Sequence, residues 1–360
     1  MSRPVASFPL LRRLELQDFR CHLALFWEPP AAHLLLWGPN ASGKTSLLES
    51  IAVVAVGRSV RGTKLDGAIR FGADRFRVQL EVGKERHRLE FLFFRDGRRF
   101  RYLNGEEATA WELFCALPTV FWPPGKEDPI RGGSQVRREL LDRAVLSLRP
   151  SLATDYRRYR RALTEKRALL EKGSREGLSS WNTLLSLHGS RIHSAREALF
   201  EGVLERFRAL AGRLLCSGRR LSGRLTTGMG VETADPEVWA DRFQLACERE
   251  MAARRPLLGP HRAELEILLE GRPAREVASG SERKLLGLAL LLATAVPESS
   301  LLLLDDFDSE LDAAAAERLL RELSQFPTVI VTSSSALFKG SNPESFFRLE
   351  VRDLLGSVAS

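Results

Sequence analysis

One stretch of the sequence combines glycine, lysine and threonine at a spacing that suits phosphate binding. Residues 38–45 read GPNASGKT and fit the pattern G-x-x-x-x-G-K-[ST]. The apolar run HLLLW precedes them and the helix-like run TSLLESIAVVAVG follows, so the expected context is strand, loop, helix. Glycines let backbone N–H groups turn toward a phosphate, and the positive end of the helix dipole adds to the attraction. The predicted nucleotide-binding residues are Gly38, Pro39, Asn40, Ala41, Ser42, Gly43, Lys44 and Thr45.

Two side chains of this loop have the chemistry to act on a triphosphate. Lys44 is expected to reach the β- and γ-phosphates, and the Thr45 hydroxyl is expected to be a ligand of Mg²⁺. Ala41 is expected to have a negative φ, because a Cβ is poorly tolerated in the left-handed region. The alternative interpretation of the whole stretch is a plain helix cap.

A second candidate site lies far along the chain, where LLLL runs directly into two acidic residues, Asp305 and Asp306. Four apolar residues followed by acids predict a central parallel strand that presents carboxylates at its C-terminal edge. Asp305 is expected to hold Mg²⁺ through a water. Asp306 is expected to orient or deprotonate the water that attacks the γ-phosphate, which makes it the predicted catalytic residue. The alternative is a strand end with two solvated acids.

A third motif, ASGSERK, stands just before a long helical run, and it resembles the signature motif of the ABC ATPase superfamily. That resemblance implies an anion site at a helix N-terminus, which meets the nucleotide held by a second subunit. The residues concerned are Ser279, Gly280, Ser281 and Glu282. Ser309 and Asp312 match the D-loop that follows in the same superfamily. Considered without its context, the sequence ASGSE also fits a plain helix cap.

The positive charge of the chain is concentrated in one segment. The chain has 54 Lys and Arg against 46 Asp and Glu, a net charge of +8. Residues 131–224 alone hold 21 basic and 9 acidic residues, so the rest of the chain is net negative. This pattern indicates a polyanionic partner such as DNA, with an ordinary solvated arginine-rich surface as the alternative. The predicted DNA contacts are Arg157, Arg158, Arg160 and Arg161.

Cysteine usage and hydropathy favour a soluble cytoplasmic protein. The four cysteines are scattered without a CxxC pair, which indicates neither a disulfide framework nor a zinc site. The N-terminus has too short an apolar stretch for a signal peptide. The apolar run 285–304 is interrupted by Pro297 and Glu298, so we expect a helix, a turn and a strand there, and no membrane span.

The pattern of apolar residues predicts one lobe formed by both ends of the chain, with a helical arm inserted between them. Period-2 alternation predicts strands in the opening region, and prolines and glycines near Leu117 mark a boundary. Residues 134–215 predict two long amphipathic helices joined by a polar turn, which form an antiparallel arm. From 262 onward, strands and helices alternate, which predicts a parallel sheet. The expected domains are 1–116, the N-terminal half of the ATPase lobe, 117–256, the basic helical arm, and 257–360, the C-terminal half of the lobe.

Taken together, these motifs resemble the RecF family of bacterial recombination-mediator ATPases, which are related to SMC proteins. The resemblance rests on LELQDFR, GPNASGKTSLLES, GRSVRG, Phe121 with Pro123, RRELLD, GPHRAELEILLEGRPARE, ASGSERK and LLLLDDFDSELD. It implies an α/β fold: an ABC-type P-loop ATPase head with a β-rich subdomain and an inserted α-helical arm. ATP and Mg²⁺ are the implied cofactors.

The resemblance also implies a function. Members bind ATP, dimerise around it, clamp DNA at gaps or single-strand/double-strand junctions, and work with a RecR-type mediator to help load RecA in recombinational repair and replication restart. A weak, DNA-stimulated ATPase would reset the clamp. The chain departs from the family pattern at Ala41, Ser46 and Ser281 and in WPPGKED, and no Q-loop glutamine is evident near Val120, since Gln135 fits a helix start.

Three rival functions are less well supported. A transporter-type ATPase subunit would dock a membrane partner and usually has a histidine after the strand TVIVT, where this chain has serines. An ABC-type nuclease needs a further metal-binding domain, and an SMC-like architectural protein needs a much longer coiled coil.

Overall fold

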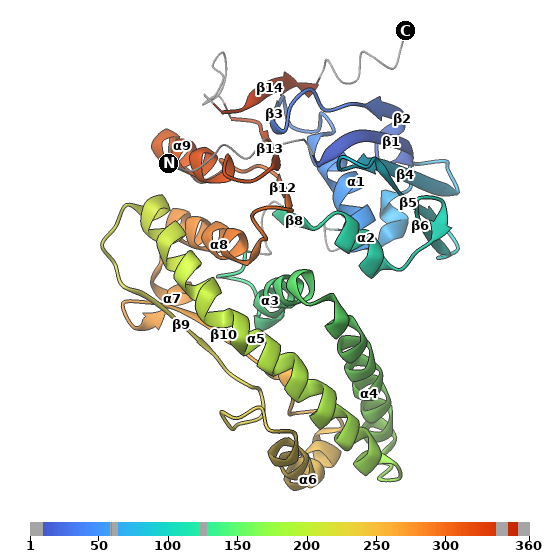
Figure 1. Cartoon of the computed structure of the whole chain (residues 1–360), viewed down its shortest axis with the longest axis vertical. Coiled ribbons are helices and arrows are strands. Elements are labelled where there is room, and N and C mark those ends of the chain that lie inside the picture. Colours follow the sequence, from blue (N-terminus) through green and yellow to red (C-terminus); the bar gives the residue numbers. More distant parts are fainter. Residues whose placement is uncertain (1–9, 58, 60–63, 123–127, 336–344, 352–360) are drawn as a thin grey trace. The chain divides into compact units, whose positions relative to one another are not determined.

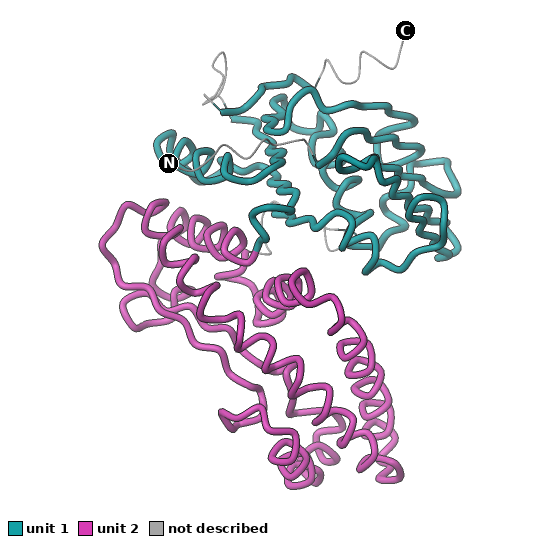
Figure 2. The backbone as a smooth tube through the Cα atoms, in the orientation of Figure 1, with its two compact units in different colours: residues 1–126, 295–360 teal, residues 127–294 magenta. Residues whose placement is uncertain are grey.

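The computed structural model describes residues 10–57, 59, 64–122, 128–335 and 345–351 of the chain. Two compact units make up the protein (Figure 2): unit 1 is Met1–Lys126 with Ala295–Ser360, and unit 2 is Glu127–Thr294. These limits differ from the expected domain limits. Residues 117–126 fall in unit 1 and not with the arm, while residues 257–294 fall in unit 2 with the arm helices.

Unit 1 contains a five-stranded sheet in which all strands are parallel (Figure 1). Across the sheet the strands are β14 (Phe347–Glu350), β3 (His33–Trp37), β13 (Thr328–Ser333), β12 (Leu301–Leu304) and β8 (Thr119–Trp122). Every residue of β12 and β13 is buried, as central parallel strands require. The parallel sheet expected near the C-terminus is therefore confirmed for β12 and β13. Because all five strands run the same way, the loops after β3, β12 and β13 leave at one edge.

The second sheet of unit 1 is antiparallel and has six strands in the order β2-β1-β4-β5-β6-β7. Its strands are β1 (Leu11–Phe19), β2 (His22–Trp27), β4 (Arg75–Val82), β5 (His87–Phe94), β6 (Arg99–Leu103) and β7 (Glu106–Glu107). The alternation seen in the sequence is confirmed, since β1 and β5 begin and end at the predicted residues. This sheet is the predicted β-rich subdomain.

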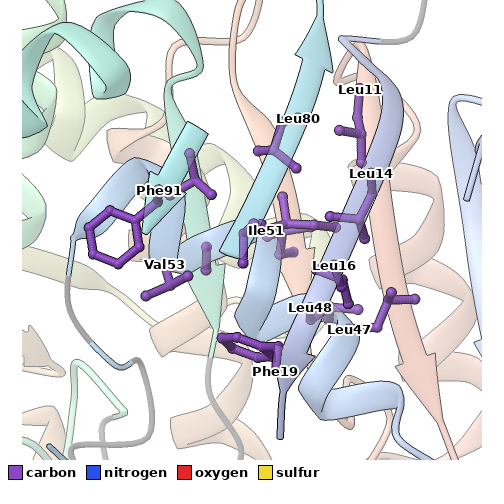
Figure 3. Packing of buried hydrophobic residues seen from close by; sticks show 14 of the residues in the cluster. Leu11, Leu14, Leu16, Phe19, Leu47, Leu48, Ile51, Val53, Leu80 and Phe91 are labelled. Carbon is purple, nitrogen blue, oxygen red and sulfur yellow. The ribbon is translucent and has the colours of Figure 1, made fainter. Parts of the chain in front are cut away.

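Helix α1 (Lys44–Val56) joins the two sheets of unit 1, because it contacts β1, β4 and β5 on one side and β8, β12 and β13 on the other. Its residues from Ser46 to Ala55 are all buried, and most of them are apolar, as expected for a helix covered on both sides. Figure 3 shows Leu47, Leu48 and Ile51 packed with side chains of the antiparallel sheet such as Leu14. This core fixes the start of α1, and with it the predicted phosphate loop. The other helices of unit 1 are α2 (Ala110–Ala116), α9 (Ala313–Leu323) and the 3₁₀ turn Leu65–Ala68.

Unit 2 is built on three helices, α3 (Ser134–Leu148), α4 (Ala153–Lys172) and α5 (Leu178–Leu215). Helices α4 and α5 pack against each other and run antiparallel (Figure 1), with left-handed glycines, Gly173 and Gly177, at the turn between them. The first of the two predicted long helices is in fact two. It breaks at Arg149 into the 3₁₀ turn Pro150–Leu152, because a proline ring excludes the preceding residue from the helical conformation.

The rest of unit 2 differs further from the expected βαβα order. Strands β9 (Leu221–Leu225), β10 (Leu265–Leu269) and β11 (Arg272–Pro273) form a separate antiparallel sheet. The expectation that the strand at 262–271 joins the parallel sheet is therefore wrong, because β10 pairs with β9. Helix α6 (Pro236–Ala253) has no counterpart among the predicted elements. The unit is completed by α7 (Ala274–Val277), α8 (Gly280–Thr294) and the 3₁₀ turn Pro260–Arg262.

Within the described ranges, no helix combines the length and the apolar character needed to cross a membrane.

Candidate nucleotide-binding site

The loop 38–45 leaves the buried strand β3 and leads into α1, as its sequence predicts. Gly43, at the helix N-cap, has a φ of 93°, a left-handed conformation that favours glycine. No side chain caps the helix, and its first turn has no acidic residue. The backbone N–H groups and the dipole of α1 therefore present positive potential at the loop, which suits a phosphate.

Lys44 is buried within this loop, with only 8% of its surface exposed. Its ammonium donates hydrogen bonds to the carbonyl oxygens of Gly38 and Pro39, both at 2.8 Å. Burial lowers the pKa of Lys44, whereas the negative charges of Asp305 and Asp306 raise it. The lysine is thus held by the loop backbone and lies in the electrostatic field of the two acids that the sequence singled out.

Ala41 contradicts its expected conformation. Its φ is 64°, in the left-handed region where a Cβ is strained, and not negative. The turn of the phosphate loop imposes this φ regardless of residue type, and the family pattern has glycine there. The departure at Ala41 is therefore a strained one, at a cost of about 1–2 kcal/mol.

The turn between β1 and β2 lies against the phosphate loop. A Cβ added to Gly43 would come within 3.3 Å of the His22 ring and 3.4 Å of the Cys21 sulfur. A hydrogen bond from His22 is the largest cause of a lowered pKa at the Cys21 thiol. Glycine is thus required at position 43 both by its φ and by this close approach.

Three stretches that the sequence analysis noted separately meet at one carboxylate. Arg20, which ends LELQDFR, donates to both oxygens of Glu49 in α1, at 2.9 and 2.7 Å. Ser59, within GRSVRG, donates to Glu49 at 2.8 Å. Glu49 is fully buried, so this paired arginine anchors α1 to the β1–β2 turn. No spacing rule relates these residues along the chain, and only the tertiary fold shows the link.

The acidic strand end lies where the sequence predicts. Asp305 follows β12, is 2% exposed, and accepts a hydrogen bond from the Thr332 hydroxyl at 2.6 Å. The same hydroxyl oxygen accepts from the backbone N–H of Asp306 at 2.8 Å. Thr332 therefore holds the carboxylate of Asp305 and the backbone of Asp306. Asp306 is partly exposed and has a φ of 50°, a rare conformation that is often found at functional sites.

The end of β13 connects the phosphate loop to the acidic strand, a role that the sequence analysis missed. Besides Thr332, this strand supplies Ser333, whose carbonyl accepts from the Gly38 N–H at 3.4 Å. The Ser333 hydroxyl donates to Asp308 at 2.7 Å. Strand β13 lies between β3 and β12 in the sheet, so its last residues reach both motifs. The only signal in the sequence was the polar ending of a strand that is otherwise apolar.

The two predicted D-loop residues hold the backbone after Asp306. The Ser309 N–H donates to the Asp306 carbonyl at 3.2 Å, and Asp312 caps α9 by accepting from the Ala315 N–H at 2.7 Å. Between them, Glu310 has a φ of 66°. These two hydrogen bonds are local, and a role of Ser309 and Asp312 across a subunit interface stays a prediction.

The predicted Mg²⁺ ligands are compatible with that ion. Thr45 is partly buried in the first turn of α1, and its hydroxyl makes no hydrogen bond within the part of the chain that the structure describes. Asp305 is held in one orientation by Thr332. Mg²⁺ prefers few protein oxygens together with waters and substrate phosphates, which matches a hydroxyl and a carboxylate at one sheet edge. Among the described residues, no group of three or more His, Cys, Asp or Glu is arranged to hold a metal.

The signature stretch belongs to unit 2, where it opens α8. Ser279 and Glu282 form a capping box: the Ser279 hydroxyl accepts from the Glu282 N–H at 3.3 Å, and the Glu282 carboxylate accepts from the Ser279 N–H at 2.8 Å. That backbone hydrogen bond is the main cause of the lowered pKa of Glu282. Arg219 donates to the same carboxylate at 2.8 Å and offsets its charge. Gly280 and Ser281 lie in the first turn.

The four predicted DNA-contact arginines are all exposed on α4. Arg160 differs from the others because it also lines a cavity of unit 2. Exposure is required for contact with DNA phosphates and also fits a solvated surface, so the assignment stays a prediction.

Comparisons of the sequence with known proteins give one consistent result. The model of the RecF/RecN/SMC N-terminal domain matches residues 10–349. The DNA replication and repair protein RecF of Stenotrophomonas maltophilia is 32% identical over 339 residues, covering 90% of this chain and 92% of the relative. RecF of Moorella thermoacetica is 30% identical over 336 residues, covering 90% of each.

Solved structures agree in fold. A RecF structure described as RecF–ATP of the RecFOR pathway has a TM-score of 0.84 at 24% identity, and it covers 97% of this chain and 98% of that one. An Smc head bound to the C-winged helix domain of ScpA has a TM-score of 0.55 at 20% identity, with 91% and 90% covered. These likenesses confirm an ABC/SMC-like ATPase fold. The sequence match to RecF proteins covers nine-tenths of the chain, so the chain belongs to the RecF family, within the RecF/RecN/SMC group.

Proposed function

We propose that this protein is an ATP-binding DNA repair and replication factor that uses ATP to control its grip on DNA. The observation that carries the proposal is the convergence, at one edge of the parallel sheet, of the Lys44 ammonium with Asp305 and Asp306. Phosphate-binding loops of this pattern bind nucleoside triphosphates, and the relatives named above are DNA replication and repair proteins.

In the proposed site each residue has a defined task. The loop N–H groups and Lys44 bind the β- and γ-phosphates, and Thr45 with Asp305 would hold Mg²⁺, which neutralises phosphate charge when bound. Asp306, next to the γ-phosphate, orients or deprotonates the attacking water, while Thr332 fixes its backbone. The Ser279 hydroxyl lies at the N-terminus of α8, where it accepts from the Glu282 N–H at 3.3 Å, and the N-terminus of a helix suits a phosphate oxygen. We therefore propose that Ser279 meets the nucleotide of a second copy.

On this view ATP joins two copies into a dimer, and slow hydrolysis releases them by removing the γ-phosphate that both copies contact. The basic helices of unit 2 supply contacts to DNA phosphates, which give affinity without sequence preference. By analogy with relatives named for the RecFOR pathway, the substrate is gapped DNA or a single-strand/double-strand junction, and the partner is a RecR-type mediator in RecA loading. The transporter alternative is disfavoured, because the matching family is RecF/RecN/SMC.

The nucleotide site is tested by Lys44→Ala. We expect binding of a fluorescent ATP analogue with Mg²⁺ to weaken about tenfold to hundredfold, because charge-assisted hydrogen bonds to phosphate are lost. Lys172→Ala, which removes the same charge from the exposed end of α4, should leave nucleotide affinity unchanged. In a second measurement, fluorescence anisotropy of labelled gapped DNA should show tighter binding with ATP for the parent protein and for Lys172→Ala, and no effect of ATP for Lys44→Ala.

Unchanged nucleotide affinity in Lys44→Ala would rule out the phosphate loop as the ATP site. Normal nucleotide binding without any effect of ATP on DNA affinity would leave the site intact and refute the coupling.

A further inference from the structure

Unit 2 contains a basic cavity that the proposed ATP site does not use. Its volume is about 390 Å³, and it lies where α3, α4 and α5 meet the turn Gly259–Arg262. Its polar wall is dominated by five arginines and a histidine: Arg138, Arg160, Arg167, Arg196, Arg262 and His261. The GPHR turn, noted above only as part of a resemblance, therefore forms part of a wall with a strong positive charge.

The acids of the cavity neutralise only part of this charge. Five arginines line it against two carboxylates, Glu139 and Asp142. Asp142 is already engaged, because the buried Arg196 binds both of its oxygens, at 2.7 and 2.9 Å, and Tyr156 donates to it at 2.5 Å. The cavity therefore has an excess of positive charge, which must be balanced by solvent ions or by a ligand.

Two of the arginines have side chains without a partner among the described residues. The guanidinium groups of Arg160 and Arg167 are exposed and form no hydrogen bond or ion pair with any residue that the structure describes. They lie on one face of α4 together with Tyr156, Tyr159 and Leu163, at intervals of three, four and seven residues. This face carries the cavity wall, so both guanidinium groups are available to an anion entering it.

The GPHR turn adds a further donor. The Tyr159 hydroxyl and His261 Nδ1 are 2.6 Å apart. Burial raises the pKa of Tyr159 and lowers that of His261 to about 3, so the phenol keeps its proton and the imidazole is neutral. Among the described residues Tyr159 has no other acceptor, so it donates to Nδ1 and the ring proton lies on Nε2. His261 Nε2 is buried without a hydrogen-bond partner in the described structure, a donor that the protein leaves unsatisfied.

The turn is shaped around this pair. Gly259 has a φ of 132°, and a Cβ there would lie closer to the Tyr159 hydroxyl than any real contact allows. The buried Arg196 of α5 donates to the Pro260 carbonyl at 2.8 Å and so attaches the turn to that helix. The position of His261 is therefore fixed by the glycine at 259 and by the hydrogen bond from Arg196 to Pro260.

We propose that this cavity binds a phosphate group, at a site separate from the phosphate loop. Guanidinium groups bind phosphate oxygens in pairs, and the Nε2–H of a neutral histidine adds a donor without adding charge. The phosphate belongs either to a DNA strand, within its backbone or at its 5′ end, or to a free polyphosphate. The DNA source rests on the DNA binding proposed above, whereas the free-anion source is independent of it.

The test uses the full chain carrying Lys44→Ala, so that binding of a phosphate at the phosphate loop is weakened equally in every variant compared. In this background Arg160→Gln with Arg167→Gln is compared with Lys172→Gln with Arg206→Gln, which removes the same charge from exposed positions of unit 2 that neither line the cavity nor belong to the predicted DNA contacts. The probes are inorganic pyrophosphate by calorimetry, and one single-stranded oligonucleotide with either a 5′-phosphate or a 5′-hydroxyl by fluorescence anisotropy. Neither pair contains a buried residue, so both variants should fold, as thermal melting will verify.

We expect the cavity variant to lose about tenfold in affinity for at least one probe relative to the matched control. A loss for pyrophosphate identifies a free anion as ligand. A loss of the preference for the 5′-phosphate identifies a strand end, and an equal loss for both oligonucleotides, with a shallower salt dependence, identifies the strand backbone. If the cavity and control variants bind all three probes alike, the cavity is no phosphate site, and the proposed ATP site is unaffected by that result.

Discussion

Two residues of the phosphate loop have a left-handed backbone, Ala41 with a φ of 64° and Gly43 with a φ of 93°, and of these Ala41 carries a Cβ. A loop that must accept a triphosphate has little freedom to relax this strain, because Gly43 is packed against the β1–β2 turn and Lys44 is bound to two loop carbonyls. The strain at Ala41 is therefore a local defect in a loop that is otherwise well supported.

Replacing Ala41 by glycine should remove this strain. We expect Ala41→Gly to raise the free energy of unfolding by about 0.5–1 kcal/mol. Relief of the left-handed strain stabilises the folded state, and the greater entropy of glycine in the unfolded chain offsets part of that gain. Urea unfolding measures the change. Ala24→Gly, in the extended strand β2, is the control and should lower stability by about 0.5–1 kcal/mol. A similar loss at position 41 would show that Ala41 does not adopt a positive φ.

At this scale the sequence predicts the motif residues well and their supports poorly. Lys44 and Asp305 are found by local spacing alone, because strand, loop and helix follow one another in the chain. Thr332 and the Arg20–Glu49 pair are missed, since each joins segments that only the folded sheet brings together. Ala41 is mispredicted because the fold imposes φ on it.

Among the elements, α4 and α6 are joined by a buried ion pair. Lys166 lies 2.6 Å from Glu250, and both side chains are 1% exposed. The Lys166 ammonium also lies 4.3 Å from the centre of the Phe243 ring, and burial lowers its pKa while Glu250 opposes that shift. Glu250 in addition accepts from the Leu257 N–H at 2.7 Å, which connects the pair to the chain leading into the GPHR turn.

Breaking this pair should destabilise unit 2 strongly. Lys166→Met leaves the Glu250 charge buried without its cation, and we expect a loss of about 3–5 kcal/mol. The matched control is Arg175→Met. It breaks an exposed ion pair with Glu248, which lies on α6 like Glu250; the Arg175 and Glu248 side chains are 65% and 72% exposed. That change should cost at most about 1 kcal/mol. Equal losses for the two variants, in chemical denaturation, would refute a buried role for Lys166.

Secondary structure was predictable where one periodicity runs without interruption, as in β5 and α5. It failed where a neighbour in space decides the outcome. Strand β10 has the pattern of a parallel strand but pairs antiparallel with β9, a partner with little apolar signal of its own. Strand β8 lies beside β12 in the parallel sheet, although its sequence adjoins a proline-rich boundary.

At the scale of the whole molecule, the motifs are divided between the two units. The phosphate loop, the acidic strand and the D-loop belong to unit 1, whereas the signature helix and the basic arginines belong to unit 2. In the dimer proposed above, the phosphate loop of one copy and the signature helix of the other hold the same nucleotide. Because α8 packs against α5, unit 2 extends to Thr294, whereas the sequence predicted that the arm ends at residue 256.

In the proposed dimer, one ATP is held by the phosphate loop of one copy and the Ser279 helix of another. The most direct measurement is the mass in solution, by light scattering after size exclusion, of Asp306→Asn with ATP and Mg²⁺. We predict twice the chain mass of 40.3 kDa with ATP, and one chain without it. Adding Ser279→Arg should abolish the dimer while nucleotide binding persists, whereas adding Ser180→Arg, at the exposed start of α5, should not. A monomer that binds ATP fully at every protein concentration, or a dimer unaffected by Ser279→Arg, would contradict the claim.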